Sequence, residues 1–88
     1  MESAGIIIKG KVQNVGFRYF VLKIAERYGI HGFVKNETDG SVYIEAEGLE
    51  PGFSRFLHEC SQGPGWARVN SVDITELPPA NFIDFRVK

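Results

Sequence analysis

Two stretches of the sequence space their apolar residues as a helix does, three and four positions apart. The first stripe comprises Phe17, Phe20, Val21, Ile24, Ala25 and Tyr28. The second begins just after Pro51, a residue that suits the first turn of a helix, and comprises Phe53, Phe56, Leu57 and Cys60. Gly29 and the run Gly63-Pro64-Gly65 are placed to end these helices. The spacing predicts two amphipathic helices whose stripes face a core.

The remaining apolar stretches are short and favour β-strands. Three consecutive isoleucines in Gly5–Lys11 favour a central strand, because β-branched residues suit extended backbone. Further strands are expected over residues 31–37, 41–48, 68–77 and 82–87. Asp39-Gly40 favours a tight hairpin turn. In the third strand, Val42, Ile44 and Ala46 alternate with Ser41, Tyr43, Glu45 and Glu47, which predicts one buried face and one solvent-exposed face.

The order is strand, helix, strand, strand, helix, strand, followed by an extra C-terminal strand. Such an order favours an α+β fold, a ferredoxin-like βαββαβ sandwich with an antiparallel sheet and two helices on one face. Its first and third strands would be central neighbours, so the loop after the first strand could approach Lys35 and Asn36. We expect residues 1–88 to form a single domain, because 88 residues with 43% hydrophobic side chains can build one small core.

Composition narrows the possible functions. The net charge of −1 favours neither nucleic acid nor an anionic membrane surface as a partner. The single Cys60 has no disulfide partner, and no His, Cys or Asp cluster has the spacing of metal ligands. The first residues lack the basic and apolar regions of a signal peptide, and Ile6–Ile8 is too short to span a membrane. A lone cysteine suits a reducing compartment, so we expect a cytoplasmic protein, and we also expect a monomer.

The stretch from Gly10 to Arg18 offers the most distinctive chemistry. Two glycines and Asn14 let the backbone bend, so successive N–H groups could converge at the start of the helix beside Arg18. Converging amides, a helix N-terminus and a guanidinium favour an anion with several oxygens, most naturally phosphate. An ordinary glycine-containing turn with a surface arginine would have the same residues, and both interpretations remain open at this point.

No nucleophile or general base stands out. The serines lack an evident histidine and acid partner, His31 and His58 lie far from the loop in sequence, and Glu45 and Glu47 are expected on the solvent-exposed strand face. Asn36 could orient a water molecule, or it could simply cap the Asp39-Gly40 hairpin. Without a base, the chemistry must need little proton transfer. Cleavage of acyl phosphates fits, because the departing carboxylate needs no proton.

Two long motifs resemble the signatures of the acylphosphatase family. The first is Gly10-x-Val12-Gln13-x-Val15-x-Phe17-Arg18. The second is Gly32-Phe33-Val34-Lys35-Asn36, three residues, Gly40-x-Val42, five residues and Gly48. Ala67-Arg68-Val69 after Gly63-Pro64 also looks like a family segment. The resemblance spans nearly the whole chain, in the right order.

The resemblance implies an enzyme that hydrolyses acyl phosphates without a metal or cofactor. Arg18 and the backbone amides of Gln13, Asn14, Val15, Gly16, Phe17 and Arg18 would bind phosphate, which would also be a product and a competitive inhibitor. Asn36 would position the attacking water. The family usually has glycine where this chain has Asn14; asparagine is the next most tolerant of positive φ, so the loop should still form.

Two other functions remain in view. The same strand order builds RNA-recognition domains, although Glu45 and Glu47 would repel a phosphate backbone. The signatures also occur in a carbamoyl-phosphate-handling domain of a larger maturation enzyme, but a free-standing protein is the simpler expectation here. Bisphosphoglycerate, carbamoyl phosphate and acetyl phosphate all remain possible as the physiological substrate.

Overall fold

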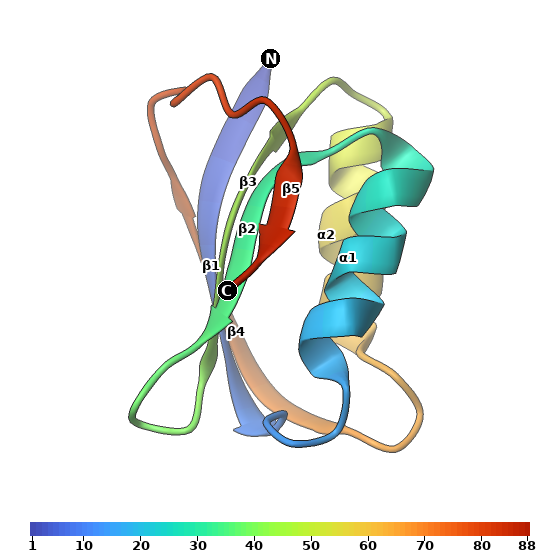
Figure 1. Ribbon diagram of the computed structural model, residues 1–88, viewed down its shortest axis with the longest axis vertical. Helices are drawn as coiled ribbons and strands as arrows, with labels where there is room; N and C mark the ends of the chain where they lie inside the picture. Colours follow the sequence, from blue (N-terminus) through green and yellow to red (C-terminus); the bar gives the residue numbers. More distant parts are fainter.

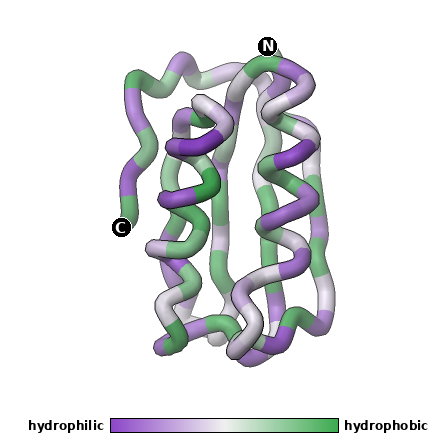
Figure 2. The backbone as a smooth tube through the Cα atoms, turned by 90° about the vertical axis from the view of Figure 1, so that its right-hand side faces the viewer, coloured by the Kyte–Doolittle hydropathy of each residue, from purple (hydrophilic) through white to green (hydrophobic).

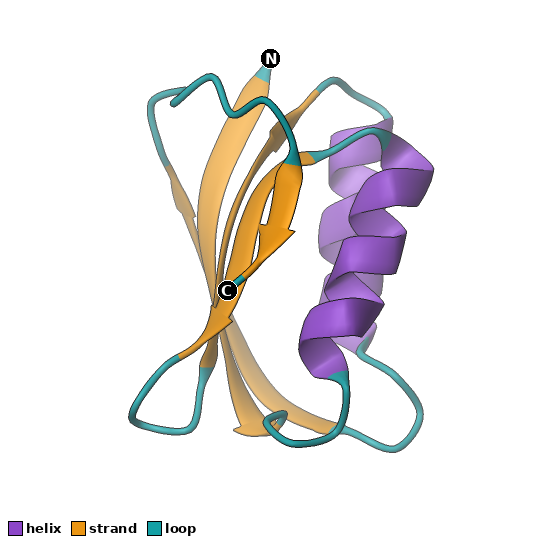
Figure 3. Ribbon diagram, in the orientation of Figure 1, coloured by secondary structure: helices purple, strands orange, loops and turns teal.

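Both helices lie on the same face of one five-stranded sheet, as the ribbon views show (Figures 1 and 3). The computed structural model describes residues 1–88. The elements are β1 (Glu2–Lys11), α1 (Phe17–Tyr28), β2 (His31–Asn36), β3 (Val42–Gly48), α2 (Gly52–Gln62), β4 (Arg68–Glu76) and β5 (Phe85–Val87). Gly29 ends α1 in the left-handed region with φ 67°, as its position predicts.

The sheet has the strand order β4-β1-β3-β2-β5, with β1 and β3 adjacent at its centre. The pairs β1–β3, β1–β4 and β2–β3 are antiparallel, which confirms the ferredoxin-like arrangement. The extra strand β5 pairs with β2 in parallel, so the complete sheet is mixed. Because β2 ends at Asn36 and β1 leads into the loop before α1, this topology brings both segments to the same end of the molecule (Figure 1).

The core lies between the sheet and the helices. Ala4, Ile6 and Ile8 of β1 are buried at alternate positions, as are Val42, Ile44 and Ala46 of β3. The helices contribute the buried side chains Phe17, Val21, Ile24, Ala25, Phe53, Phe56 and Cys60. Phe20 and Leu57 are only partly buried but pack against this cluster. Figure 2, which looks onto the helices, shows hydrophilic segments recurring along them, as amphipathic helices require.

The junction of β1 with β4 shapes the start of the loop that follows β1. The register shifts between Lys9 and Gly10, so one strand contains a bulge. A Cβ on Gly10 would lie 2.1 Å from the carbonyl oxygen of Arg68, and Gly10 has a φ of 136°. Only glycine fits this close approach, which sets the direction in which β1 enters the loop.

The expectation that Glu47 lies on a solvent-exposed face is wrong. Glu47 is only 2% exposed, and Ser41 is buried as well. The carboxylate of Glu47 accepts hydrogen bonds from the backbone N–H groups of Ala80 (2.9 Å) and Phe82 (2.5 Å). These residues belong to the segment 77–84, which we call the strap. The strap connects β4 to β5 and covers Glu47 on the face that alternation alone assigns to solvent, whereas Ile7 and Ile74 remain exposed (Figure 1).

The last strand is also shorter than the predicted range 82–87, because β5 contains only Phe85–Val87. Phe82 is outside the ladder, since its N–H donates to Glu47 and its ring packs 5.9 Å from that of Phe33. The alternation fails at this end, because Ile83 is 83% exposed while Phe85 and Val87 pack against the core. The other strand boundaries differ from the predicted ones by one residue, except that β1 begins at Glu2, where it pairs with Gly48.

Candidate active site

The loop between β1 and α1 bends through two left-handed residues. Asn14 has a φ of 62°, and Gly16, the residue that precedes α1, has a φ of 76°. The expectation that Asn14 replaces a glycine by adopting positive φ is confirmed. Alternation of left-handed and right-handed residues turns successive N–H groups toward one point, the geometry of an anion-binding nest.

The backbone N–H groups of residues 13–19 donate to no other group of the protein. For Phe17, Arg18 and Tyr19 this is expected, because the first residues of a helix have no intrahelical acceptor. The same helix end carries the positive pole of the helix dipole, and no acidic residue occupies its first turn. The loop and the start of α1 therefore present amide donors and a positive potential with no competing carboxylate.

Arg18 is the second residue of α1 and is half-buried. Its Nη1 donates to the backbone oxygen of Lys88 at 2.6 Å, which ties the guanidinium to the end of β5. A guanidinium has five N–H donors, so most of them remain for a ligand. This contact fixes the direction of the Arg18 side chain beside the β1–α1 loop.

Asn36, at the end of β2, faces the same cavity as Arg18. This cavity has a volume of about 180 Å³ and is lined by Val12, Asn14, Gly16, Phe17, Arg18, Tyr19 and Asn36. The alternative interpretation of Asn36 as a cap of the hairpin finds no support, because its side chain makes no hydrogen bond there. Asp39 and Ser41 make the hairpin's own side-chain contacts.

Two of the predicted phosphate-binding residues do not line the cavity. Gln13 directs its side chain away, and its Nε2 donates to the carbonyl oxygens of Glu37 (2.7 Å) and Ser41 (2.8 Å). The carbonyl of Val15 accepts a hydrogen bond from Nε1 of Trp66. The side chain of Gln13 thus braces the loop against the β2–β3 hairpin. The backbone N–H groups of Gln13 and Val15 have no acceptor within the protein, although neither residue lines the cavity.

The lining of this cavity contains no carboxylate, imidazole or thiol, and its one side chain with an ionisable hydroxyl is Tyr19. Cys60 is in the core, where burial raises the pKa of its thiol, and this agrees with its predicted role as a small apolar residue. His31 and His58 are exposed on other elements. No three His, Cys, Asp or Glu side chains come together as a metal site would need, and neither helix is long and apolar enough to cross a membrane.

Three neighbours of the site were not expected from the sequence. Tyr19, 63% exposed, lines the cavity; it falls off the apolar stripe in the first turn of α1, and that position could have identified it. Lys88 contributes its backbone oxygen, which no side-chain pattern reveals. Trp66 reaches Val15 from the α2–β4 loop. The sequence signal that could have identified it is a large aromatic residue in a turn, where the structure leaves it exposed.

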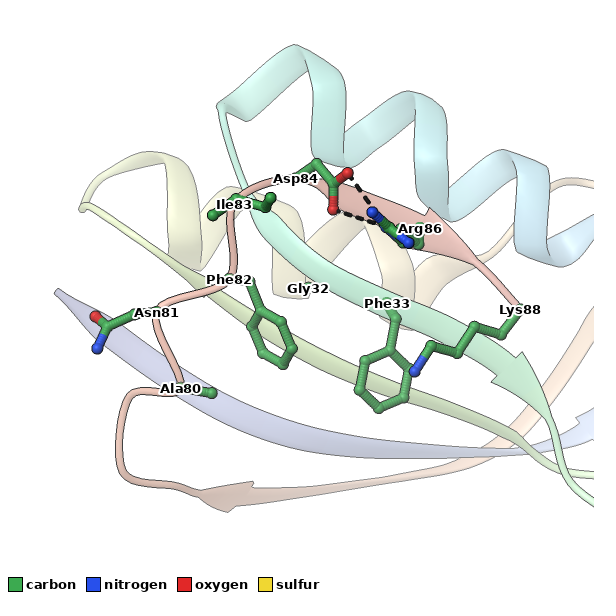
Figure 4. A pocket seen from close by; sticks show the side chains of 9 residues that line it. All are labelled: Gly32, Phe33, Ala80, Asn81, Phe82, Ile83, Asp84, Arg86 and Lys88. Carbon is green, nitrogen blue, oxygen red and sulfur yellow. Dashed lines mark hydrogen bonds and ion pairs between the residues drawn. The ribbon is translucent and has the colours of Figure 1, made fainter.

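A second hollow, of about 300 Å³, lies between the strap and β2 (Figure 4). The rings of Phe33 and Phe82 lie side by side there, and Nζ of Lys88 is 4.0 Å from the centroid of the Phe33 ring. Arg86 pairs with Asp84 at 3.2 Å. Of these contacts, the one between the rings of Phe33 and Phe82 joins the strap to β2.

Comparison with known proteins identifies the family of the chain. The sequence model of the acylphosphatase family matches residues 4–87. An acylphosphatase of Thermotoga maritima is 44% identical over 88 residues, covering 100% of this chain and 98% of that protein. The crystal structure of acylphosphatase from Bacillus subtilis superposes with a TM-score of 0.95 at 36% identity, covering 100% of this chain and 99% of that one.

A more distant likeness concerns a larger protein. The crystal structure of T. kodakarensis HypF matches with a TM-score of 0.87 at 36% identity. It covers 100% of this chain but only 12% of HypF. The chain belongs to the acylphosphatase family, whose members are enzymes, and the family and fold support hydrolysis of acyl phosphates.

Proposed function

We propose that this protein hydrolyses the carboxyl–phosphate anhydride of acyl phosphates with a site made of the β1–α1 loop, Arg18 and Asn36. The phosphate group lies against the backbone amides of residues 13–18 and accepts hydrogen bonds from the Arg18 guanidinium. Asn36 orients a water molecule for attack on phosphorus from the side opposite the leaving group.

The reaction is a displacement at phosphorus. The water oxygen forms a new P–O bond while the bond from phosphorus to the acyl oxygen breaks, and the carboxylate leaves with that electron pair. A phosphate oxygen of the substrate takes the water proton, so no protein base is needed. Phosphoryl transfer asks mainly for positioning and charge stabilisation, which backbone amides and a guanidinium supply.

The proposal is supported chiefly by one observation: amides without protein acceptors, an arginine and an amide side chain meet in a single cavity. Each group matches one requirement of the reaction. The amides and Arg18 suit the phosphate oxygens, and the carboxamide of Asn36 can accept from and donate to a water molecule. The family membership supports the same substrate class.

Phosphate release from benzoyl phosphate tests the proposal directly. We expect hydrolysis that is unchanged by a metal chelator and competitively inhibited by inorganic phosphate. Failure to hydrolyse benzoyl phosphate and other acyl phosphates would refute the proposed activity. Loss of activity in chelator with recovery on adding a divalent cation would refute the mechanism while leaving the activity in place.

A role in carbamoyl-phosphate handling is less well supported, because the relatives matched over nearly their whole length are named acylphosphatase. RNA binding is also disfavoured, because the strap crosses the sheet face that would stack bases and Glu47 is buried beneath it. A salt-dependent gel shift with single-stranded RNA should show no complex.

A further inference from the structure

We propose that Trp66 is a positioning residue that holds the Gly16 amide in its anion-binding orientation. The indole lies on the α2–β4 loop, 51 residues after Val15 in the sequence. Its Nε1–H donates to the carbonyl oxygen of Val15, which belongs to the β1–α1 loop. Trp66 does not line the cavity that contains Gly16, Arg18 and Asn36. It therefore approaches the loop from outside and does not compete with a ligand.

Peptide geometry transmits this contact to the cavity. The Val15 carbonyl and the Gly16 N–H belong to one peptide unit, and the bond between these residues is trans. In a planar trans peptide the C=O and N–H point in opposite directions. Fixing the Val15 oxygen toward Trp66 therefore fixes the Gly16 hydrogen away from Trp66, toward the cavity that Gly16 lines.

The loop needs such a restraint because Gly16 makes its peptide easy to turn over. Glycine populates positive and negative φ about equally, and nothing lies within 4 Å of a Cβ placed on Gly16. Rotation of the 15–16 peptide would bring the Val15 carbonyl toward the phosphate site and replace a donor by a negative dipole. The hydrogen bond from Trp66 favours the orientation that binds an anion over the one that repels it.

Packing gives Trp66 no comparable role. Its side chain is 69% exposed and is absent from the core cluster and from the partly buried residues around it. Loss of the indole N–H should thus leave the fold intact, so a structural effect and a positioning effect can be separated. Trp66 is also the only tryptophan in the chain, so tryptophan fluorescence reports on the surroundings of this one side chain.

The test compares three variants by inhibition with inorganic phosphate during benzoyl phosphate hydrolysis and by urea denaturation. Trp66→Phe keeps a ring and loses the N–H donor, Trp66→Ala loses both, and Leu49→Ala is a control, because Leu49 is 71% exposed outside the cavity. We expect Trp66→Phe and Trp66→Ala to raise the phosphate inhibition constant similarly, by about threefold to tenfold, the range of one net hydrogen bond. The urea midpoints should match that of the control.

Amide NMR supplies a second readout that a structural role would not change. Titration of the wild type with inorganic phosphate should shift the Gly16 amide proton and the Trp66 indole proton with one dissociation constant. The Gly16 shift should shrink in Trp66→Phe. Should that variant fail to fold, the wild-type titration decides, because a Gly16 amide that does not respond to saturating phosphate overturns the proposal.

Two other outcomes of these experiments can also be told apart. A normal inhibition constant in Trp66→Phe with a raised one in Trp66→Ala would mean that the ring matters and the N–H does not, which overturns the proposal. The inference rests on the proposed function for the identity of the anion. If phosphate binds but no acyl phosphate is hydrolysed, the proposed function fails while the phosphate titrations still test the role of Trp66.

Discussion

Replacement of Arg18 by lysine separates charge from geometry at the proposed site. In the structure, Nη1 of Arg18 is committed to the Lys88 oxygen at 2.6 Å, which leaves the other donors of the planar guanidinium for phosphate. A guanidinium can serve both partners because its donors diverge from a rigid fork. The single ammonium of lysine cannot keep the Lys88 contact and also present two parallel donors to phosphate.

The expected cost follows from the donors that are lost. Lysine preserves the positive charge but removes a preorganised, paired hydrogen bond to a group that is negative in both ground and transition states. Removal of one preorganised oxyanion donor costs a factor of about 10²–10³ in rate. We therefore expect Arg18→Lys to lose at least ~100-fold in kcat/KM, on the order of 3 kcal/mol.

The assay is steady-state hydrolysis of benzoyl phosphate by both proteins over a series of inorganic phosphate concentrations. Inhibition by phosphate should weaken in Arg18→Lys along with the rate, because the same donors contact the product. Lys23→Arg is a useful control, since it changes a cation of the same helix that is absent from the cavity lining. Near-equal kcat/KM and equal phosphate inhibition in Arg18→Lys would remove Arg18 from the site and refute the mechanism.

Substitutions at three further positions test the remaining parts of the structure. Asn36→Ala should leave the phosphate inhibition constant largely unchanged while kcat collapses; an equal loss in both would make Asn36 a phosphate ligand instead. Asn14→Gly should retain activity, and Asn14→Ala should be less stable than Asn14→Gly by roughly 1 kcal/mol in urea denaturation, because alanine resists positive φ. Glu47→Gln should lower the free energy of unfolding by about 1.5–3 kcal/mol, the value of a hydrogen bond to a charged group. Glu45→Gln is the control, and equal effects of the two would contradict the strap contacts described for Glu47.

The elements of the core could be predicted because their periodicity is strong. The stripe from Phe17 to Tyr28 and the alternation of Val42, Ile44 and Ala46 each match buried positions in the structure. The turn signals also held locally, since Gly29 ends α1 and Asn14 adopts positive φ. These features depend on neighbours in sequence, and a single sequence contains that information.

Features that depend on the strap could not be predicted in the same way. Glu47 satisfies the alternation of an exposed position, yet it is buried because a segment more than thirty residues later crosses over it. The direction of β5, parallel to β2, likewise follows from the path of the strap across the sheet. The sequence does not distinguish an exposed acidic residue from a buried one whose carboxylate accepts hydrogen bonds from a distant segment.

The candidate site likewise combines features that depend on neighbours in sequence with features that depend on distant residues. Its main-chain part, the bend through Asn14 and Gly16 at the start of α1, has a local signature of glycine, asparagine and arginine. The contacts that hold this part in place come from distant residues: Gln13 reaches the β2–β3 hairpin, and Trp66 reaches Val15. Geometry at the anion site is thus encoded locally, whereas its rigidity depends on the tertiary structure.

The strap joins the stability of the fold to the geometry of the site. The buried carboxylate of Glu47 holds Ala80 and Phe82, the strap leads into β5, and Lys88, directly after β5, supplies the oxygen that Arg18 contacts. β5 pairs with β2 through a short parallel ladder and packs Phe85 and Val87 against the core, and the contacts of Glu47 add to this by holding the segment that leads into it. A site that works by positioning requires such support, since amides and a guanidinium stabilise a transition state only when they are already in place. Residues far from the phosphate can therefore influence turnover without touching the substrate.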